Sequence, residues 1–381
     1  MAGSGDGGVC GGVSVQKDSE FLDFISHRKR SVLPAKYQSL LVNLCNKLTE
    51  RMDAASAIEE LKQEGSFIPA KSVPRAAVEI QEALGLGVRF FRKPSASEPI
   101  KLLRYILNSQ PISPKEYLLK CLDRQSGLGT FLQFHRDGYI RETSIKSLVA
   151  APHGAFEFTS IVYRLNDWVS QVRDATSIYA ASYFPLTDPK TIASSALFLL
   201  PMIDSFNRWK PDTARLVADT FWRDDVLNEL EILMLQNPKT GLGRPLNALM
   251  RCSYFDKSLP KLAMFAKQPI VRAMALDSLI NKRARFVNGV KKQWIDKVYN
   301  LSRNVPNYVD REFEHSEDIA KLLLLGAKDR ASSVRKIIAA SLNQTSHAPI
   351  AAKNEVAKLL ANDSSPAVRL QVDFFMKNGL A

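Results

Sequence analysis

The sequence predicts an all-α protein in which helical hairpins are stacked into a solenoid. Two observations lead to this fold class: a segment in which a hydrophobic residue and an arginine open a helix recurs along the chain, and the recurrence has a nearly constant spacing. The copies lie at 135–149, 166–181, 267–280, 329–342 and 362–375, with a looser one at 237–249.

The spacing of the arginines indicates an array of units. From Arg141 to Arg173 is 32 residues, from Arg335 to Arg369 is 34, and from Arg272 to Arg335 is 63, which is close to two units. Self-similarity at a fixed period of about 20–50 residues is typical of solenoids and propellers.

Helical periodicity follows each of these arginines. Around Arg335, for example, Val334, Ile337, Ile338 and Ser341 stand at positions that share one face of a helix. A shorter apolar helix is expected before it, over 318–328. Each unit is therefore predicted to be a helical hairpin.

In three copies an aspartate precedes the arginine by six residues. The pairs are Asp167 and Arg173, Asp329 and Arg335, and Asp363 and Arg369. This arrangement resembles HEAT-type (armadillo-type) repeats, in which the aspartates and arginines of successive turns alternate as a hydrogen-bonded ladder. The resemblance implies a right-handed α-solenoid and carries no catalytic residue across. Because Ala266 and Pro238 occupy the acidic positions before Arg272 and Arg244, we expect the ladder to be interrupted there.

The chain divides into three parts. Residues 1–18 are rich in glycine and are expected to be a disordered tail. Residues 19–125 predict helices outside the repeat frame, which suits the atypical terminal cap of a solenoid or a separate domain. Residues 126–381 form the predicted HEAT-like array. At 381 residues the chain exceeds the roughly 250–300 residues of a single core, and an elongated array accounts for that length.

Composition and motifs exclude several classes of protein. The longest apolar run, 196–203, is far shorter than the roughly 20 residues of a membrane span, and the N-terminus has no signal-peptide pattern. The scattered cysteines favour a reducing, cytoplasmic location, and no histidine or cysteine spacing suggests a metal site. Three Gly-Leu-Gly triplets lack the rest of a nucleotide-binding motif. We therefore expect no membrane partner, metal, small-molecule cofactor or catalytic residue.

Charge provides the main functional signal. The chain has 52 basic and 39 acidic residues, a net charge of +13, and this balance favours polyanionic partners. Residues 267–303 hold nine basic and two acidic side chains. The candidate nucleic-acid contacts are Lys282, Arg283 and Arg285, in a loop expected over 281–289, and Lys291, Lys292 and Lys297, on a helix expected to follow it.

Three functions are compatible with these observations. The first is a non-enzymatic scaffold that binds a protein partner through the solenoid surface. The second is a nucleic-acid-binding module that uses the basic segment 267–303. The third is an enzyme similar to the alkylpurine DNA glycosylases, for which the segment 208–225, with Trp209, Trp222, Asp224 and Asp225, is the place to look. The absence of a catalytic constellation favours the two binding functions.

Overall fold

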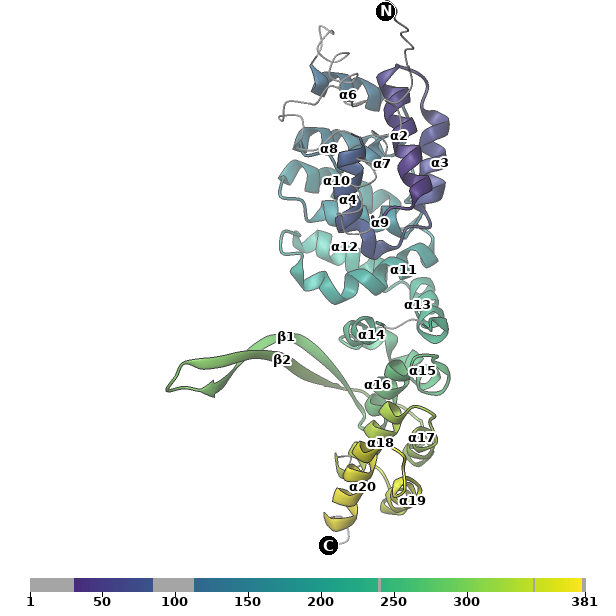
Figure 1. The fold of residues 1–381 in the computed structure, drawn as a ribbon, viewed down its shortest axis with the longest axis vertical. Coiled ribbons are helices and arrows are strands. Elements are labelled where there is room, and N and C mark those ends of the chain that lie inside the picture. Colours follow the sequence, from purple (N-terminus) through teal and green to yellow (C-terminus); the bar gives the residue numbers. More distant parts are fainter. Residues whose placement is uncertain (1–30, 85–112, 239–240, 345–346, 379–381) are drawn as a thin grey trace, which may run out of the picture.

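The computed structural model describes residues 31–84, 113–238, 241–344 and 347–378. The predicted tail 1–18 lies outside these residues. The described part is mostly helical, and its one sheet has two strands. Figure 1 shows the helices following one another along the long axis of the molecule, with the hairpin projecting to one side.

The N-terminal elements precede the first recurring segment. Their bounds are α2 Ala35–Thr49, α3 Ala55–Gly65, the 3₁₀ helix η1 Ala70–Ser72, α4 Val73–Ala83, α6 Pro114–Arg124 and α7 Gly129–Leu132.

The middle of the chain contains α-helices and two 3₁₀ helices. In chain order these are α8 Gly138–Lys146, α9 Ala155–Leu165, α10 Ser170–Tyr183, α11 Pro189–Leu199, η3 Leu200–Ser205, α12 Pro211–Phe221, α13 Asp224–Gln236, α14 Gly243–Leu249, η4 Ser253–Ser258, α15 Leu259–Phe265 and α16 Pro269–Ile280.

The hairpin separates α16 from the last helices. The remaining elements are β1 Arg283–Asp296, β2 Leu301–Glu312, α17 Ile319–Ala327, α18 Ser332–Gln344, α19 Ile350–Leu360 and α20 Pro366–Asn378.

Capping residues and prolines set where the helices begin. Asp137, Asp188 and Asp318 stand before α8, α11 and α17, and each carboxylate accepts hydrogen bonds from backbone N–H groups of the first turn. Proline lies in the first turn of α11, α12 and α16, where its missing N–H removes no helical hydrogen bond.

The helices pack in two columns. Helices α9, α11, α13 and α15 contact one another in succession, and so do α14, α16, α18 and α20. The two columns also contact each other, as α11 does α14 and α15 does α16. One continuous core runs between the columns from Ile145 to Phe375.

A second core lies in the N-terminal part of the chain. It joins Leu33 and Tyr37 to residues as distant as Ile140 and Phe156. It therefore extends across the boundary expected near residue 125. Tyr163 packs against both cores, so hydrophobic contact continues from one part to the next.

The turn arginines link successive turns of the stack. Arg272 donates to both carboxylate oxygens of Asp329, at 2.6 and 2.9 Å, and Arg335 donates to both oxygens of Asp363. Both arginines also donate to a carbonyl six residues earlier in their own turn. Among the described residues, the Arg173 side chain donates to the carbonyls of Asp167 and Trp168 in its own turn and to no aspartate of another turn.

The sequence-based expectation of helix after residue 290 is wrong, because residues 283–312 form an antiparallel β-hairpin. The residues expected in the loop 281–289 begin β1. Gly289 has a positive φ of 72° beside a register shift between Val287 and Val290, which fits a bulge at this point. The all-α prediction therefore holds for the helical parts and fails for this hairpin.

Candidate functional site

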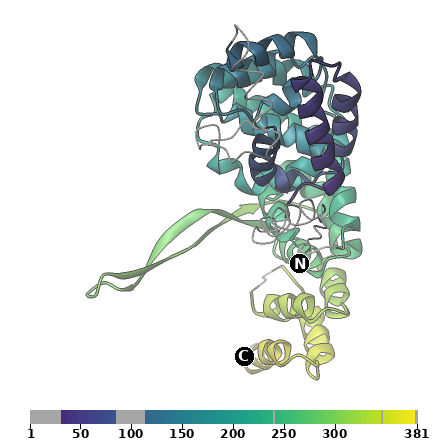
Figure 2. The ribbon, with the colours of Figure 1, turned by 45° about the horizontal axis from the view of Figure 1, so that its top comes forward.

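The hairpin forms an arm that extends away from the helices, as the two views in Figures 1 and 2 agree. We call residues 283–312 the hairpin arm, and residues 288–304 its outer arm. The arm leaves the stack on the side of α8, α10 and α12 (Figure 1). Apart from Asp296, every residue of the outer arm is exposed.

The base of the arm is fixed to the helices by hydrogen bonds. Arg311 donates to both oxygens of Asp256, at 2.7 and 2.8 Å, and to the carbonyls of Met250 and Cys252. The Val287 carbonyl accepts a hydrogen bond from Arg251, just after α14, and the Val287 N–H donates to Asn247 in α14. These contacts hold the direction in which the outer arm projects.

Three of the predicted nucleic-acid contacts form ion pairs with two acids at the base of the arm. Arg283 and Arg285 both pair with Asp310, the latter through two hydrogen bonds of 2.8 and 3.0 Å. The hydrogen bonds from Arg285 lower the pKa of Asp310 below its ordinary value. Lys282 pairs with Glu314 at 2.8 Å. These cations are therefore engaged within the protein and hold the arm's base.

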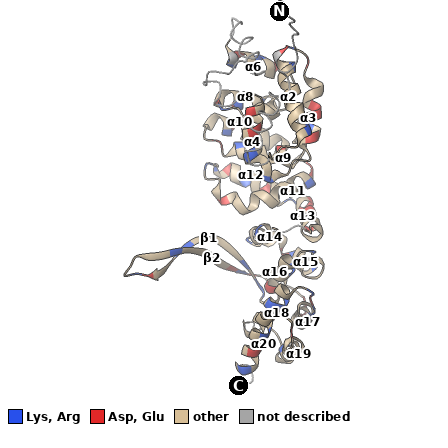
Figure 3. Ribbon diagram, in the orientation of Figure 1, with Lys and Arg blue, Asp and Glu red and all other residues tan. Residues whose placement is uncertain are grey.

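The outer arm carries the cations that lack such partners. It contains Lys291, Lys292, Lys297 and Arg303, together with the single acid Asp296. Within the described ranges, no salt bridge joins any of these four cations to a carboxylate. Figure 3 shows basic residues along the projecting strands. The basic segment thus has two parts: cations at the base of the arm that form ion pairs, and cations on the outer arm that do not.

The strand register places basic side chains on both faces of the ribbon. Residues directly opposite one another in an antiparallel pair share a face. One face holds Lys292 and Trp294, opposite Asn304 and Ser302, and the other holds Lys291 and Gln293, opposite Val305 and Arg303. The Lys292 ammonium lies 3.8 Å from the centroid of the Trp294 ring, a cation–π contact. Arg303 donates to Gln293 at 2.9 Å.

The end of the arm is a turn with an apolar surface. Asp296 accepts hydrogen bonds from the N–H groups of Val298 and Tyr299, and Asn300 has a positive φ of 53°, which asparagine tolerates well. The side chains of Val298 and Tyr299 are 88% and 76% exposed, and Ile295 is 65% exposed. Contiguous exposed apolar residues of this kind mark binding surfaces.

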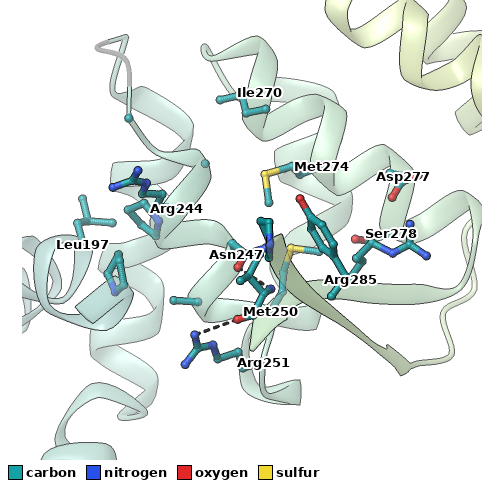
Figure 4. A pocket seen from close by; sticks show the side chains of 18 of the residues that line it. Leu197, Arg244, Asn247, Met250, Arg251, Ile270, Met274, Asp277, Ser278 and Arg285 are labelled. Atoms are coloured by element: carbon teal, nitrogen blue, oxygen red, sulfur yellow. Dashed lines mark hydrogen bonds between the residues drawn. The ribbon is translucent and has the colours of Figure 1, made fainter. Parts of the chain in front are cut away.

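A cavity of about 1090 Å³ opens at the base of the arm. Figure 4 shows side chains from α11, α14, α16 and the hairpin converging on it. Its apolar residues include Phe198, Met202, Ile270, Met274 and Tyr308, and its polar residues include Arg244, Asn247, Arg251, Asp277, Ser278 and Arg285. Burial raises the pKa of Asp277, against the opposing effect of nearby Arg283 and Arg285.

The tryptophans and acids considered for a glycosylase do not line this cavity. Trp209 stacks on Phe206 with 5.1 Å between ring centroids, and Trp222 stacks on Tyr254 at 5.7 Å. Asp224 pairs with Lys257, and Asp225 with Arg223. These four residues therefore serve packing and surface ion pairs.

Sequence reasoning did not identify Arg303 and Trp294 as a joint part of the site. Arg303 lies within the basic segment 267–303, and the helix expected after residue 290 does not place Trp294 on an exposed surface. A strand interpretation would have placed both on an exposed ribbon. The cavity residues come from segments up to 140 positions apart, from Leu197 to Ile337, and no sequence signal joins them.

Other classes of site find no support in the described part of the chain. None of its helices combines the length and apolarity needed to cross a bilayer. No cluster of three or more histidine, cysteine, aspartate or glutamate side chains there has a metal-binding arrangement.

Comparison with known proteins adds no family. A search of protein-family models found no match to the chain, and a search of curated proteins found no significant relative.

Proposed function

We propose that this protein is a HEAT-type, right-handed α-solenoid that binds duplex nucleic acid without catalysing a reaction, and that the outer arm contacts the phosphate backbone. One observation carries the proposal: four cations without a carboxylate partner, within the described residues, lie on a ribbon that projects from the helices. The Asp–Arg links between successive turns support the solenoid assignment.

Charge provides the driving force for this interaction. Unpaired cations on an exposed ribbon can approach phosphates and release the counterions that surround the duplex, which favours binding most at low salt. The cations at the arm's base are held by Asp310 and Glu314. Within the described part of the arm, Lys291, Lys292, Lys297 and Arg303 have no carboxylate partner.

The shape of the arm also suits a nucleic-acid groove. Two paired strands lie about 4.8 Å apart, and a two-stranded ribbon fits the major groove of B-DNA, which is about 12 Å wide. Because Lys291 and Lys292 point to opposite faces, a ribbon in the groove places a cation toward each phosphate wall. Contacts of this type position a protein on the duplex without reading its sequence.

The apolar end of the arm fits the same partner. Aliphatic and aromatic side chains on DNA-binding arms can enter between base steps and unstack them. Val298 and Tyr299 at the turn, and Ile295 beside it, are exposed in the free protein. They would reach the bases while the lysines behind them contact phosphates.

A matched pair of charge variants tests the proposal. The arm variant carries Lys291→Gln, Lys292→Gln, Lys297→Gln and Arg303→Gln. The control variant carries Lys190→Gln, Lys328→Gln, Lys358→Gln and Lys377→Gln, four exposed lysines in or next to helices. Both lose the same net charge. In fluorescence anisotropy on unrelated duplexes, we expect the arm variant to bind at least about tenfold more weakly, or ~1.4 kcal/mol. Equal loss in both variants would show that the arm has no special role.

A protein-binding scaffold is the second candidate, and the apolar turn of the arm favours it. Exposed apolar residues rimmed by polar ones also mark protein interfaces. The variant with Lys291, Lys292, Lys297 and Arg303 changed to glutamine separates the two functions. A protein partner held by the apolar turn would remain in native complexes of this variant, whereas the salt-dependent binding of duplexes would be lost.

A further inference from the structure

The cavity at the base of the arm has the dimensions of a ligand site. Its volume of about 1090 Å³ is slightly above the roughly 300–1,000 Å³ typical of ligand pockets. Phe198, Met202 and Met274 come from the helices, and Tyr308 comes from β2. A flat ring can pack against such side chains, since aromatic and thioether groups make favourable contacts with π-systems.

The polar side chains of the cavity have unused hydrogen-bonding capacity. Ser278 is 1% exposed, and its hydroxyl has no hydrogen-bond partner in the described part of the chain. A buried polar group without a partner costs free energy, so a ligand that reaches Ser278 would remove that cost. This hydroxyl is the strongest sign that the cavity is built for an occupant.

Two neighbours of Ser278 extend this polar edge. Asp277 accepts a hydrogen bond from Asn281 through Oδ1, and its Oδ2 accepts none from the described residues. Asn247 uses its Oδ1 to accept from the Val287 N–H, which leaves its side-chain NH₂ to donate. The cavity therefore offers a carboxylate acceptor, an amide donor and a hydroxyl that can do either.

A cation lines the side of the cavity opposite Asp277 and Ser278 (Figure 4). Arg251 is engaged by Asp204 and the Val287 carbonyl, and Arg285 by Asp310. Arg244 also lines the cavity, is exposed, and has no hydrogen bond or ion pair with another described residue. Arginine binds phosphate well because its planar guanidinium can donate two parallel hydrogen bonds.

We propose that this cavity binds a nucleotide: the nucleobase packs against the Met274 wall, its polar edge meets Asp277, Ser278 and Asn247, and its phosphate meets Arg244. The inference rests on the proposed function for one source of the ligand, a nucleotide extruded from a duplex held by the arm. The other source is a free mononucleotide. The cavity and the arm share β1 and β2, so the two sites lie next to each other (Figure 4).

Extrusion from a duplex is energetically accessible here. Moving a base out of the stack costs a few kcal/mol, and the cavity supplies new contacts for the base. The proposal concerns binding alone and requires no covalent step.

The first experiment uses a short duplex with a single 2-aminopurine, whose fluorescence rises when this base leaves the base stack of the duplex. Met274→Trp puts a larger ring on the wall against which the nucleobase would pack, and Met264→Trp, on an exposed part of α15, is the matched control. We expect the wild type and the control to raise the fluorescence on binding. Met274→Trp should retain duplex affinity within about twofold and abolish the rise. An unchanged rise in Met274→Trp would overturn the cavity's role in extrusion.

The second experiment titrates free 2-aminopurine riboside 5′-monophosphate into the protein. The double variant Asp277→Asn, Arg244→Gln keeps the cavity's shape and should bind it about tenfold more weakly than wild type, or ~1.4 kcal/mol. This second experiment tests the proposal even if the protein binds no duplex, or if Met274→Trp fails to fold. If the protein neither binds the mononucleotide nor raises the 2-aminopurine fluorescence of the duplex, the nucleotide site is refuted. If only the binding of duplexes to the hairpin arm fails, the proposed function alone is refuted.

Discussion

Arg311 and Asp256 form a bidentate ion pair with nitrogen–oxygen distances of 2.7 and 2.8 Å. This pair joins the end of the hairpin to the 3₁₀ helix η4, 55 residues earlier in the chain. Hydrogen bonding to Asp256 raises the pKa of Arg311 above its ordinary value. The same guanidinium donates to the carbonyls of Met250 and Cys252. The arm is thus free at its outer end and fixed at its base.

Replacing Arg311 by lysine should loosen the arm without removing its charge. Lysine cannot reproduce the planar guanidinium with its two parallel hydrogen bonds. We therefore expect the free energy of local opening at the base of the arm to fall by about 1–2 kcal/mol. Hydrogen exchange of the Phe286 and Val309 amides, which lie in paired positions, measures this. Exchange as slow as in the wild type would show that other contacts fix the arm.

Removing Asp167 should destabilise the whole stack. Its side chain is 2% exposed and accepts hydrogen bonds from Arg141, at 2.7 and 2.9 Å, and from Arg164 at 2.8 Å. Asp167→Ala leaves two guanidinium groups without their carboxylate, for which we expect a loss of about 3–5 kcal/mol in urea unfolding. Asp174→Ala, which breaks the exposed pair with Lys210, should cost less than ~1 kcal/mol. Equal losses would contradict the structural role of the buried pair.

These turn contacts are the part of the fold that the sequence predicts best. The Asp–Arg frame repeats because each turn has the same local chemistry, and a single chain therefore displays it several times. Arg272 shows the limit of this reasoning: Ala266 replaces the acid in its own turn, yet its guanidinium still pairs forward with Asp329, beyond the inserted hairpin.

The hairpin could not be predicted by periodicity. Val290, Trp294, Val298 and Leu301 satisfy helical spacing, and all four are exposed on the arm. Because neither face of the outer ribbon is buried, its strands lack the alternation that normally identifies a half-buried strand. The useful local signals were Gly289 and Asn300, both with positive φ. The cavity could not be predicted at all, since only the fold brings its residues together.

Gly129→Ala should be strongly destabilising. A Cβ atom at this position would lie 2.3 Å from the Ser144 carbonyl oxygen and 2.5 Å from the Ser147 hydroxyl, so the backbones of α7 and α8 would have to separate. We expect a loss of about 1–3 kcal/mol or more. Gly65→Ala is the control, because its Cβ would meet the Tyr37 ring at an ordinary 3.5 Å. Thermal unfolding of the two variants tests the close approach, and a loss no larger at Gly129 than at Gly65 would argue against it.

His135 should make stability depend on pH in mildly acidic solution. Burial, assisted by Arg136 and Arg141, lowers its pKa to about 4, whereas the unfolded value is about 6.5. The unfolded chain therefore binds a proton first as the pH falls from ~6.5 to ~4, and the free energy of unfolding drops by up to ~1.4 kcal/mol per pH unit. Urea unfolding of the wild type and His135→Gln at several pH values measures the difference. Parallel profiles would mean that His135 does not titrate in this way.

The salt dependence of duplex binding tests the central claim most directly. On duplex DNA each phosphate contact contributes about −0.9 to the slope of log affinity against log salt concentration, so loss of the four outer-arm cations should reduce its magnitude by up to ~3.6. We predict this reduction for the variant with Lys291, Lys292, Lys297 and Arg303 changed to glutamine, and no more than a small change for the control with four glutamines on the helices. Identical slopes for the wild type and the arm variant would contradict the account.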